Sequence, residues 1–439
     1  MLIKIVGAGL AGSEAALTLA EMGYEVELFE QKPQFFSAAH KLTGAAELVC
    51  SNSLKSEELG SAHGLLKHEL RLLGSPLLEI SDHARLPGGK ALTIEREKFS
   101  KLVTERLEAH PRISFRKEKL DRIPEGAKVL IASGPLTSPE LSDDIKKHFG
   151  GEHLYFYDAT SPVVSLESLD LSKFFWANRN QDGDDYLNLP LTKEAYEAFW
   201  NEIQKAEKVE AHLPEEKLQF FEGCLPIEEI ARRGIQTLAC SAMKPSGFGD
   251  RCPAETYAVI QFRRERAAGE LLSMVGFQSR MKWPEQIRIF RSLPGMENAE
   301  FMRLGSMHRN TFINTPAHLN DRLEAKNRSG LHFAGQITGS EGYSEAIATG
   351  HYAALMMAEM PILPEVTAIR SLVRFLVASD PRHFQPMNFN FGLLPPQSGG
   401  NKKSVGGKIY KSRKAARAMA HAERPISEFA SVCRRLVLS

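Results

Sequence analysis

A glycine-rich turn near the N-terminus constrains the fold of this chain more than any other feature. The apolar segment 2–6 runs directly into Gly7-Ala-Gly9-Leu-Ala-Gly12, and a stretch of helical composition, 13–22, follows. Small residues between a strand and a helix let the backbone approach a pyrophosphate, which then faces the helix N-terminus. The sequence therefore predicts a βαβ unit that binds a dinucleotide. The expected contacts are Gly7, Ala8, Gly9, Leu10, Ala11 and Gly12.

The second expected strand, 26–30, ends in an acidic residue, Glu30, eighteen residues after Gly12. A carboxylate at this point of a dinucleotide-binding fold binds a ribose 2′-hydroxyl and repels a 2′-phosphate. Together with the glycine turn, Glu30 therefore favours FAD or NAD over NADP at this site.

Two later segments repeat the succession of strand and glycine turn. Residues 128–133 end at Gly134, and residues 331–334 lead into Gly335-Gln336-Ile-Thr-Gly339 before a helical run, 345–360. Flavoproteins of the two-dinucleotide type return to the ribityl and phosphate part of FAD at such a late segment, so FAD is preferred over NAD. Taken alone, each segment is also compatible with a buried strand and a turn. The expected cofactor contacts here are Gly134, Gly335, Gln336 and Gly339.

The expected fold is α/β, with a Rossmann-like FAD-binding domain of the two-dinucleotide-binding flavoprotein type and an inserted α/β substrate domain. The 439 residues, 43% hydrophobic and 25% charged, indicate a soluble globular protein of two or three domains. We assign 1–150 and 321–396 to the discontinuous FAD-binding domain, 151–320 to the inserted domain and 397–439 to a basic C-terminal tail.

The five cysteines are widely and irregularly spaced, without a C-x-x-C pair. This pattern suits neither a disulfide framework nor a zinc site, so we expect reduced thiols and no metal. The N-terminal apolar segment has neither a basic region nor a small-residue cleavage site, and no part of the chain needs a membrane. We therefore expect a cytoplasmic protein.

The net charge of +1 does not by itself indicate a nucleic-acid binder, because phosphate binding requires a local surplus of Lys and Arg. One such surplus lies at 402–417, which holds seven basic residues and no acidic residue. A solvated tail and an RNA contact are both compatible with this segment.

A cysteine in an unusual setting follows the glycine turn. The segment Ala46-Glu-Leu-Val-Cys50-Ser-Asn-Ser-Leu-Lys-Ser56 places it just before a polar loop, which a plain oxidoreductase does not need. With this segment, the chain resembles the folate- and FAD-dependent tRNA (uracil-5-)-methyltransferase family from end to end. The other matching motifs lie at 64–67, 134–138, 186–188, 221–228, 243–245, 276–278, 282–283, 307–314, 334–339, 341–343 and 390–396.

The resemblance implies a reaction with FAD as the cofactor and two cosubstrates. 5,10-Methylenetetrahydrofolate supplies a one-carbon unit, reduced FAD supplies reducing equivalents, and NADH or NADPH reduces the flavin. The product implied is 5-methyluridine in the T-loop of tRNA, with the T-arm held in a basic cleft between the domains and the 402–417 segment as a further contact.

This chemistry needs two reactive groups. Uracil C5 becomes a nucleophile only after a group adds to C6, and a thiolate suits that addition. A second group must then take the C5 proton. By the resemblance, Cys224 in Gly-Cys-Leu-Pro-Ile-Glu is the nucleophile and Cys50 in Val-Cys-Ser-Asn-Ser is the flavin-side thiol, although the roles are open to exchange. For either thiol alone, a small buried side chain is the competing interpretation.

Four other residues are candidates for binding flat or anionic ligands. Tyr343 is expected either to stack on the pterin or the isoalloxazine, or to pack in the core. Lys282, His308 and Arg309 are expected either to hold folate carboxylates or RNA phosphates, or to form ion pairs at a domain interface. The remaining cysteines are expected to be structural, and Leu189 stands where relatives often have a cysteine, which excludes a third essential thiol there. Those cysteines are Cys240, Cys252 and Cys433.

The chain departs from the family pattern at 83–96, at Ser344-Glu-Ala346 and at 397–400. Other functions remain as alternatives: the same chemistry on ribosomal RNA, and a non-catalytic protein that binds FAD and RNA. A flavoprotein that modifies the wobble uridine is disfavoured because its long helical C-terminal domain is absent. A simple flavin oxidase or reductase leaves Cys224 and the motif at 307–314 without a use.

Overall fold

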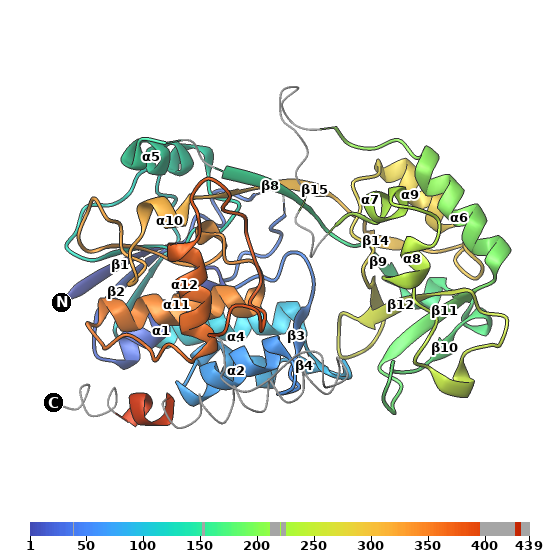
Figure 1. Ribbon diagram of the computed structural model, residues 1–439, viewed down its shortest axis with the longest axis horizontal. Coiled ribbons are helices and arrows are strands. Elements are labelled where there is room, and N and C mark those ends of the chain that lie inside the picture. The colour runs from blue at the N-terminus through green and yellow to red at the C-terminus, as the bar shows by residue number, and fades with distance from the viewer. Residues whose placement is uncertain (38, 152–153, 211–219, 221–224, 396–425, 432–439) are drawn as a thin grey trace.

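The computed structural model describes residues 1–37, 39–151, 154–210, 220, 225–395 and 426–431. Two segments with expected roles lie outside these ranges: the one that contains Cys224 and the basic segment 402–417. The described chain forms two lobes joined by a long two-stranded ribbon (Figure 1).

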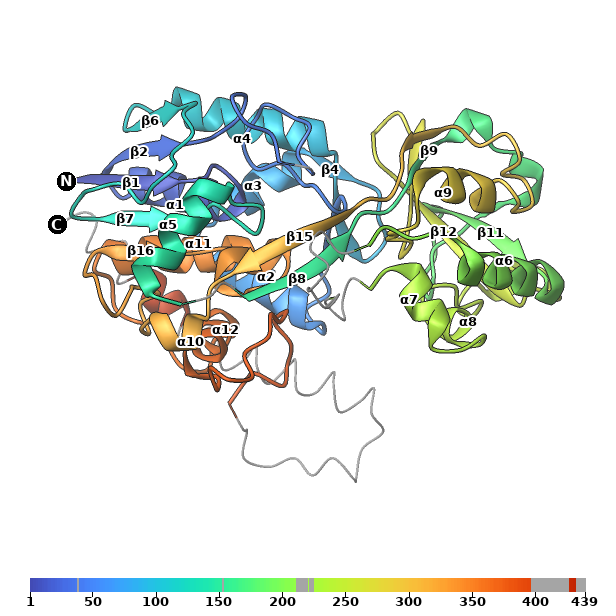
Figure 2. The ribbon, with the colours of Figure 1, turned by 90° about the horizontal axis from the view of Figure 1, so that it is seen from above.

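A five-stranded parallel sheet forms the centre of the first lobe. Its order is β16-β7-β1-β2-β6, so a strand from the last quarter of the chain completes a sheet begun at the N-terminus (Figure 2). The strands are short, and the two at one edge, β7 and β16, are buried along their whole length, as expected when both faces of a parallel sheet are covered. The four strands expected near 2–6, 26–30, 128–133 and 331–334 are confirmed. The strands are β1 (Leu2–Val6), β2 (Glu25–Phe29), β6 (Ile113–Arg116), β7 (Val129–Ile131) and β16 (Leu331–Phe333).

Two long helices pack against each other beside this sheet. α1 (Leu10–Glu21) and α11 (Tyr343–Met357) are buried along nearly their whole length. They cross closely at Gly350, where an added Cβ would lie 2.3 Å from the carbonyl oxygen of Ala11. The late glycine turn also packs here, because an added Cβ at Gly335 would lie 2.9 Å from Cβ of Ala11.

A buried polar pair joins the same helices. Nδ1 of His351 lies 2.8 Å from Oε1 of Glu14, and the other carboxylate oxygen accepts a hydrogen bond from the Leu77 amide. Both side chains are buried, so their mutual contact offsets the cost of removing them from water.

Further helices surround the first lobe, and a three-stranded sheet of order β3-β5-β4 lies against it. At the far end of the chain, Phe429 in the helix 426–431 packs into this lobe's core. The elements are β3 (Ser53–Ser56), β4 (Arg85–Leu86), β5 (Ala91–Ile94), α2 (Ala62–Leu72), α3 (Pro76–His83), α4 (Arg96–Ala109), α5 (Pro139–Phe149), α10 (Thr315–His318) and α12 (Ala368–Ala378).

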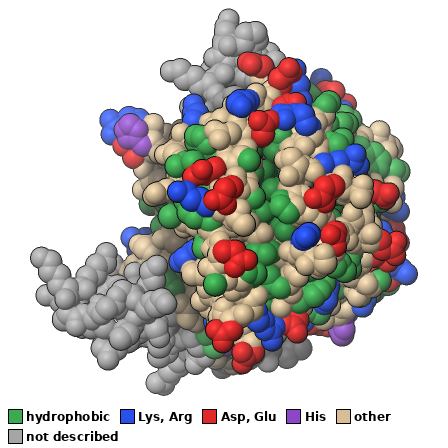
Figure 3. Space-filling view, turned by 90° about the vertical axis from the view of Figure 1, so that its right-hand side faces the viewer, with side chains coloured by type: hydrophobic (Ala, Val, Ile, Leu, Met, Phe, Trp, Pro, Cys, Tyr) green, Lys and Arg blue, Asp and Glu red, His purple; other side chains and the backbone are tan. Residues whose placement is uncertain are grey.

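The second lobe is built on a six-stranded antiparallel sheet of order β10-β11-β12-β13-β9-β14, with its own hydrophobic core. On its outer face, acidic and basic side chains are interspersed (Figure 3). Its elements are β9 (Val163–Ser165), β10 (Phe175–Trp176), β11 (Tyr186–Leu191), β12 (Ala258–Arg264), β13 (Leu271–Met274), β14 (Phe301–Arg303), α6 (Lys193–Lys205), α7 (Ile227–Arg232), α8 (Thr237–Cys240) and α9 (Trp283–Phe290).

The ribbon between the lobes consists of β8 (Leu154–Ala159) and β15 (Met307–Phe312), which pair in antiparallel fashion. His308 lies opposite Asp158 in this register. Side chains alternate along β15, so His308, Asn310 and Phe312 are buried on one face, while Arg309 projects from the other.

Candidate functional site

The glycine turn between β1 and α1 is closed to side chains at two of its three glycines. An added Cβ at Gly7 would lie 2.6 Å from the Ala132 carbonyl oxygen, and one at Gly12 would lie 1.8 Å from the Gly7 carbonyl oxygen. At Gly9, by contrast, an added Cβ would meet no described atom within 4 Å. The turn therefore presents bare backbone to an open space at the N-terminus of α1, as a pyrophosphate requires.

Glu30 braces this turn from the end of β2. One carboxylate oxygen accepts a hydrogen bond from the Ala8 amide at 2.9 Å, and the other accepts one from the Lys32 amide at 3.0 Å. The side chain is buried but lines the pocket above the turn. A carboxylate has about four acceptor positions, so each oxygen of Glu30 retains capacity for a ribose hydroxyl.

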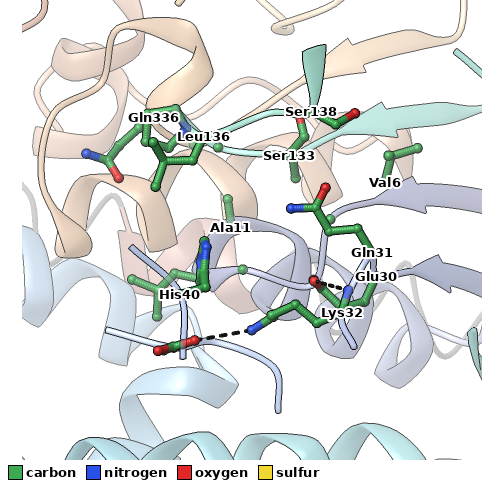
Figure 4. A pocket seen from close by; sticks show the side chains of 18 of the residues that line it. Val6, Ala11, Glu30, Gln31, Lys32, His40, Ser133, Leu136, Ser138 and Gln336 are labelled. Carbon is green, nitrogen blue, oxygen red and sulfur yellow. Dashed lines mark hydrogen bonds and ion pairs between the residues drawn. The ribbon is translucent and has the colours of Figure 1, made fainter. Parts of the chain in front are cut away.

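A pocket with about 970 Å³ of empty space lies at the carboxyl ends of β1, β2 and β7. We call it the dinucleotide pocket; Figure 4 shows it with His40 and Lys32 on one side and Leu136 and Gln336 on the other. Nine expected cofactor contacts line it, whereas Ala8, Gly12 and Gly339 do not. The nine are Gly7, Gly9, Leu10, Ala11, Glu30, Gly134, Gly335, Gln336 and Tyr343.

Cys50 lies in a second, adjoining pocket with about 670 Å³ of empty space, which we call the thiol pocket. The two pockets share five lining residues, so Cys50 stands next to the dinucleotide pocket. The shared residues are Val49, Pro135, Leu136, Gln336 and Tyr343.

Tyr343 joins the two pockets and fixes Cys50. Its hydroxyl oxygen accepts hydrogen bonds from the amides of Cys50 at 2.8 Å and Ser51 at 3.1 Å. Burial raises the pKa of the Tyr343 phenol, which therefore stays protonated. The side chain thus lines both pockets and also packs on the core of the first lobe.

Three buried carboxyl groups, from Asp158, Glu341 and Glu345, line the thiol pocket with Cys50. Burial, followed by the charge of Cys50, raises the pKa of Asp158 well above its usual range. Burial, followed by the charge of Asp158, raises the pKa of Glu341 to about 8, although Gln336 donates a hydrogen bond to it at 2.8 Å. At neutral pH the carboxyl groups of Asp158 and Glu341 are therefore protonated. The pKa of Glu345 is instead lowered, because a hydrogen bond from His63 and the charge of Lys55 outweigh its burial. The sequence analysis did not identify any of the three acids, although Glu341 opens the Glu341-Gly-Tyr343 motif.

His308 and Asn310 face the same pocket from β15. Nδ1 of His308 and Oδ1 of Asn310 are buried and have no hydrogen-bond partner among the described residues. Buried polar atoms are nearly always paired in native proteins, so these two are placed to bind a polar ligand. Burial lowers the pKa of His308 to about 4, so its ring is neutral at neutral pH.

His40, which the sequence analysis also missed, lies in the dinucleotide pocket and accepts or donates a hydrogen bond with Ser37 at 2.6 Å. Burial, with smaller contributions from Lys32 and His308, lowers the pKa of His40 to about 4. No motif surrounds this histidine, and only the packing of the loop after β2 brings it to the pocket.

The other two basic candidates lie outside both pockets. The Arg309 guanidinium stacks on the Tyr155 ring, 4.3 Å from its centroid. Lys282, at the start of α9 in the second lobe, forms an exposed ion pair with Glu207 at 2.8 Å. His308 is therefore the only one of the three that the described structure places beside Cys50.

The remaining cysteines give no second thiol at this site within the described residues. Cys240 is exposed and Cys252 is partly buried, and neither lines the two pockets. Cys224 and Cys433 lie outside the described ranges. Over those same ranges, no group of three or more His, Cys, Asp or Glu side chains is arranged to hold a metal ion. Likewise, none of the described helices combines the length and apolar character needed to cross a membrane.

The parallel sheet, the glycine turn with Glu30 and the late segment at Gly335 define the fold of a two-dinucleotide-binding flavoprotein. Two solved structures of Aquifex aeolicus GidA share this fold, in crystal forms II and I. Their TM-scores are 0.68 and 0.64, at 16% and 15% sequence identity, and the matches cover 100% and 99% of this chain and 74% and 78% of those chains.

Sequence comparison is more specific. The family model for glucose inhibited division protein A matches residues 2–360. Proteins named methylenetetrahydrofolate--tRNA-(uracil-5-)-methyltransferase TrmFO from Geobacter sulfurreducens and Natranaerobius thermophilus are 48% and 46% identical to this chain. These matches cover 95% of this chain and 97% and 98% of the two relatives. The chain belongs to this methyltransferase family, within the larger glucose inhibited division protein A family, and the resemblance noted in the sequence is confirmed.

Proposed function

We propose that this protein transfers the methylene carbon of 5,10-methylenetetrahydrofolate to C5 of a T-loop uridine in tRNA and reduces it to a methyl group with FADH2. Relatives at 45–48% identity over nearly the whole chain are named for folate-dependent tRNA uracil-5-methylation. These names favour tRNA over ribosomal RNA, and an enzyme over a non-catalytic binding protein.

One observation in the structure carries this proposal. Cys50 lies in a pocket that shares Val49, Gln336 and Tyr343 with the dinucleotide pocket. A thiol so close to a flavin site suits a reaction in which a carbon is transferred and a hydride is delivered at the same place.

The dinucleotide pocket fits FAD. Bare backbone at Gly9 and the N-terminus of α1 would hold the pyrophosphate, Glu30 would hold the ribose, and the turn at Gly335 would hold the ribityl and phosphate part. When bound, the flavin supplies the hydride that converts the transferred carbon to a methyl group. NADH or NADPH as the reductant of the flavin is part of the proposal.

The thiol pocket supplies the groups that handle the substrates. In the proposed roles, the Cys224 thiolate adds to C6 of the uracil, so that C5 attacks the methylene carbon of the folate, and the Cys50 thiolate then removes the C5 proton. Tetrahydrofolate leaves as the bond from the methylene carbon to its nitrogen breaks, and after a hydride has been delivered to that carbon the C6–sulfur bond breaks and releases Cys224. His308 and Asn310 offer unpaired polar atoms to a ring of the folate or the base. The proton held by Glu341, with its pKa of about 8, is available to the reacting groups at neutral pH.

The same proposal includes the roles of the domains and the way in which the tRNA binds. Residues 1–150 and 321–396 act as the FAD-binding domain and 151–320 as the substrate domain. The T-arm binds in a basic cleft between them, with Lys282 and Arg309 as phosphate contacts and the 402–417 segment as a further contact. The reaction takes place in the cytoplasm, without a metal.

The test uses purified protein with bound FAD, NADPH, methylenetetrahydrofolate labelled in the methylene carbon, and either an unmodified tRNA transcript or ribosomal RNA. Label is expected as 5-methyluridine in the T-loop, and a transcript with cytidine at that position is the matched control. Label in ribosomal RNA alone would show that the same reaction acts on ribosomal RNA instead of tRNA. Label in neither RNA would contradict the methyltransferase activity and leave only flavin binding.

A further inference from the structure

The segment 48–52, which carries Cys50, is held by side chains from both lobes. On the side of the first lobe, the Tyr343 hydroxyl binds the amides of Cys50 and Ser51. Further contacts come from the first residue of α4 in the first lobe, and from β14 and the end of β12 in the second lobe. These contacts, unlike the pocket itself, have no role in the function proposed above.

Arg303, the last residue of β14, ties the residue next to the thiol to the second lobe. Its guanidinium donates one hydrogen bond to the Val49 carbonyl at 3.3 Å and another to the Ser161 carbonyl at 3.2 Å. Val49 directly precedes Cys50, and Ser161 lies just before β9. A rigid planar fork with several N–H groups is well suited to holding two carbonyl groups at a fixed separation.

Arg96 makes a parallel connection one residue earlier. Its guanidinium donates to the Leu48 carbonyl at 3.1 Å and forms a largely buried ion pair with Glu265, at 2.5 Å and 2.7 Å. Arg96 begins α4 in the first lobe, whereas Glu265 follows β12 in the second. The negative charge of Glu265 acts on Arg303 as well as on Arg96, so it reduces the repulsion between the two arginines.

Asn52 completes the attachment on the other side of the thiol. Its amide nitrogen donates to the Arg264 carbonyl at 2.8 Å, and its amide oxygen accepts from Nε of Arg263 at 2.6 Å. The side chain is fully buried. The asparagine of the Val-Cys-Ser-Asn-Ser motif therefore fastens the segment to β12.

The geometry points to Arg303 as a positioning residue for Cys50: it fixes the backbone beside the thiol to the second lobe and places a positive charge near the sulfur. This inference rests on the proposed function, in which Cys50 acts as a thiolate. Arg96 and Glu265 support it by holding the preceding residue and by balancing the charge of Arg303.

Asp158 from β8, Tyr343 from α11 and Arg303 from β14 interact with the Cys50 thiol electrostatically. Burial keeps Asp158 and Tyr343 protonated, and therefore uncharged, at neutral pH. The pocket is also lined by Lys55, His308, Glu341 and the ionised Glu345. Burial lowers the pKa of Arg303 only to about 10, so it remains charged at neutral pH, whereas burial keeps His308 neutral. Removing Arg303 therefore removes a positive charge that stabilises the Cys50 thiolate relative to the thiol.

The experiment measures alkylation of Cys50 by iodoacetamide as a function of pH in the protein with bound FAD, without folate or RNA. Peptide mass spectrometry separates Cys50 from the other cysteines, and Cys50→Ala identifies its signal. In Arg303→Gln the midpoint of the alkylation profile should move upward by about one pH unit, because a nearby opposite charge is lost. Arg303→Lys keeps the positive charge, so the midpoint of its alkylation profile should stay close to that of the wild-type protein.

Arg266→Gln is the matched control, because Arg266 is a nearby arginine whose exposed guanidinium pairs with Glu97 and Glu270 and not with the Cys50 segment. An Arg303→Gln profile that coincides with that of Arg266→Gln would overturn the inference. If Arg303→Gln does not retain FAD, Glu265→Gln serves as the second test. This variant loses the negative charge between the two arginines, so the midpoint of its Cys50 alkylation profile should fall. An unchanged or raised midpoint would overturn the inference.

The proposed function can fail without affecting this result, because no methyl transfer is measured. If methyl transfer does occur, its single-turnover rate should fall about tenfold in Arg303→Gln, as expected when a reactive group is misplaced. Arg266→Gln should retain the normal rate.

Discussion

The hydroxyl oxygen of Tyr343 lies 2.8 Å from the backbone nitrogen of Cys50, although 293 positions separate the two residues in the chain. This contact links the first residue of α11 with the loop that carries the thiol. The position of the thiol is thus set by the same helix whose N-terminal region lines the dinucleotide pocket.

Replacing Tyr343 with Phe should leave the fold intact but loosen the Cys50 loop. The amides of Cys50 and Ser51 would lose their acceptor, and an unsatisfied buried donor costs about 1–3 kcal/mol. We expect a lower melting temperature and at least a tenfold loss of methyl transfer with FAD still bound. Tyr352→Phe is the matched control, because this tyrosine, also on α11, donates only to the Asp321 carbonyl, away from both pockets. Equal effects of the two variants on methyl transfer would contradict the prediction.

Cys50→Ala should abolish methyl transfer without affecting flavin content, because the side chain lines the thiol pocket and not the dinucleotide pocket, and the hydrogen bond from its Sγ to the Ala159 carbonyl, at 3.8 Å, is weak. Cys252→Ala should retain activity, since Cys252 lies outside both pockets. Visible absorbance of the bound flavin and transfer of labelled carbon to tRNA measure the two effects. An active Cys50→Ala variant would exclude the proposed role of this thiol.

Two glycines of the first turn should respond differently to a methyl group. Gly12→Ala places a Cβ against the Gly7 carbonyl oxygen, and overpacking of this kind costs about 1–3 kcal/mol of folding free energy. Gly9→Ala meets no described atom within 4 Å and should leave the FAD-free protein as stable as before. It should nevertheless weaken FAD binding at least tenfold, because the methyl group occupies the face offered to the pyrophosphate. Thermal unfolding and flavin titration together separate the two effects.

The stability of the protein should depend on the protonation of Glu341. Its pKa rises from 4.5 to about 8 on folding, so between these values the folded state binds a proton that the unfolded state has released. The free energy of unfolding therefore falls as pH rises through this window, by about 1.4 kcal/mol per pH unit at most. Glu341→Gln should show a smaller fall over this range in denaturant titrations. A surface variant, Glu108→Gln, should retain the original slope, and an identical slope in Glu341→Gln would refute the assignment.

Substituting His308 and substituting Lys282 should have different effects on the KM for methylenetetrahydrofolate. His308→Ala removes a buried ring with an unpaired nitrogen from the thiol pocket, so the KM for methylenetetrahydrofolate should rise several-fold. Lys282→Ala removes an exposed ion-pair partner in the second lobe, so the KM for folate should not change. If Lys282 contacts phosphate, its loss should instead weaken tRNA binding and reduce the dependence of that binding on salt. A rise of the KM for folate in Lys282→Ala would contradict this division.

Local patterns predicted the part of the site that is made of backbone. The glycine turn and Glu30 are contiguous with their strands, so their spacing alone indicated a dinucleotide site, and the late segment at Gly335 indicated how the sheet is completed. The acids of the thiol pocket could not be found in this way. Asp158 lines the thiol pocket from β8, and Arg303 reaches the Val49 carbonyl beside Cys50 from β14, so both arrive on strands that are distant from Cys50 in the sequence. Pairing between distant strands carries no local sequence signal.

The ribbon of β8 and β15 has a consequence for how the family tolerates change. Because successive residues of a strand face opposite sides, one residue inserted into β15 would turn His308 and Asn310 out of the thiol pocket and bring their neighbours in. An insertion of similar size in an outer loop of the second lobe would leave that register untouched. The length of the connection between the lobes is therefore under stricter constraint than the size of the lobe it carries.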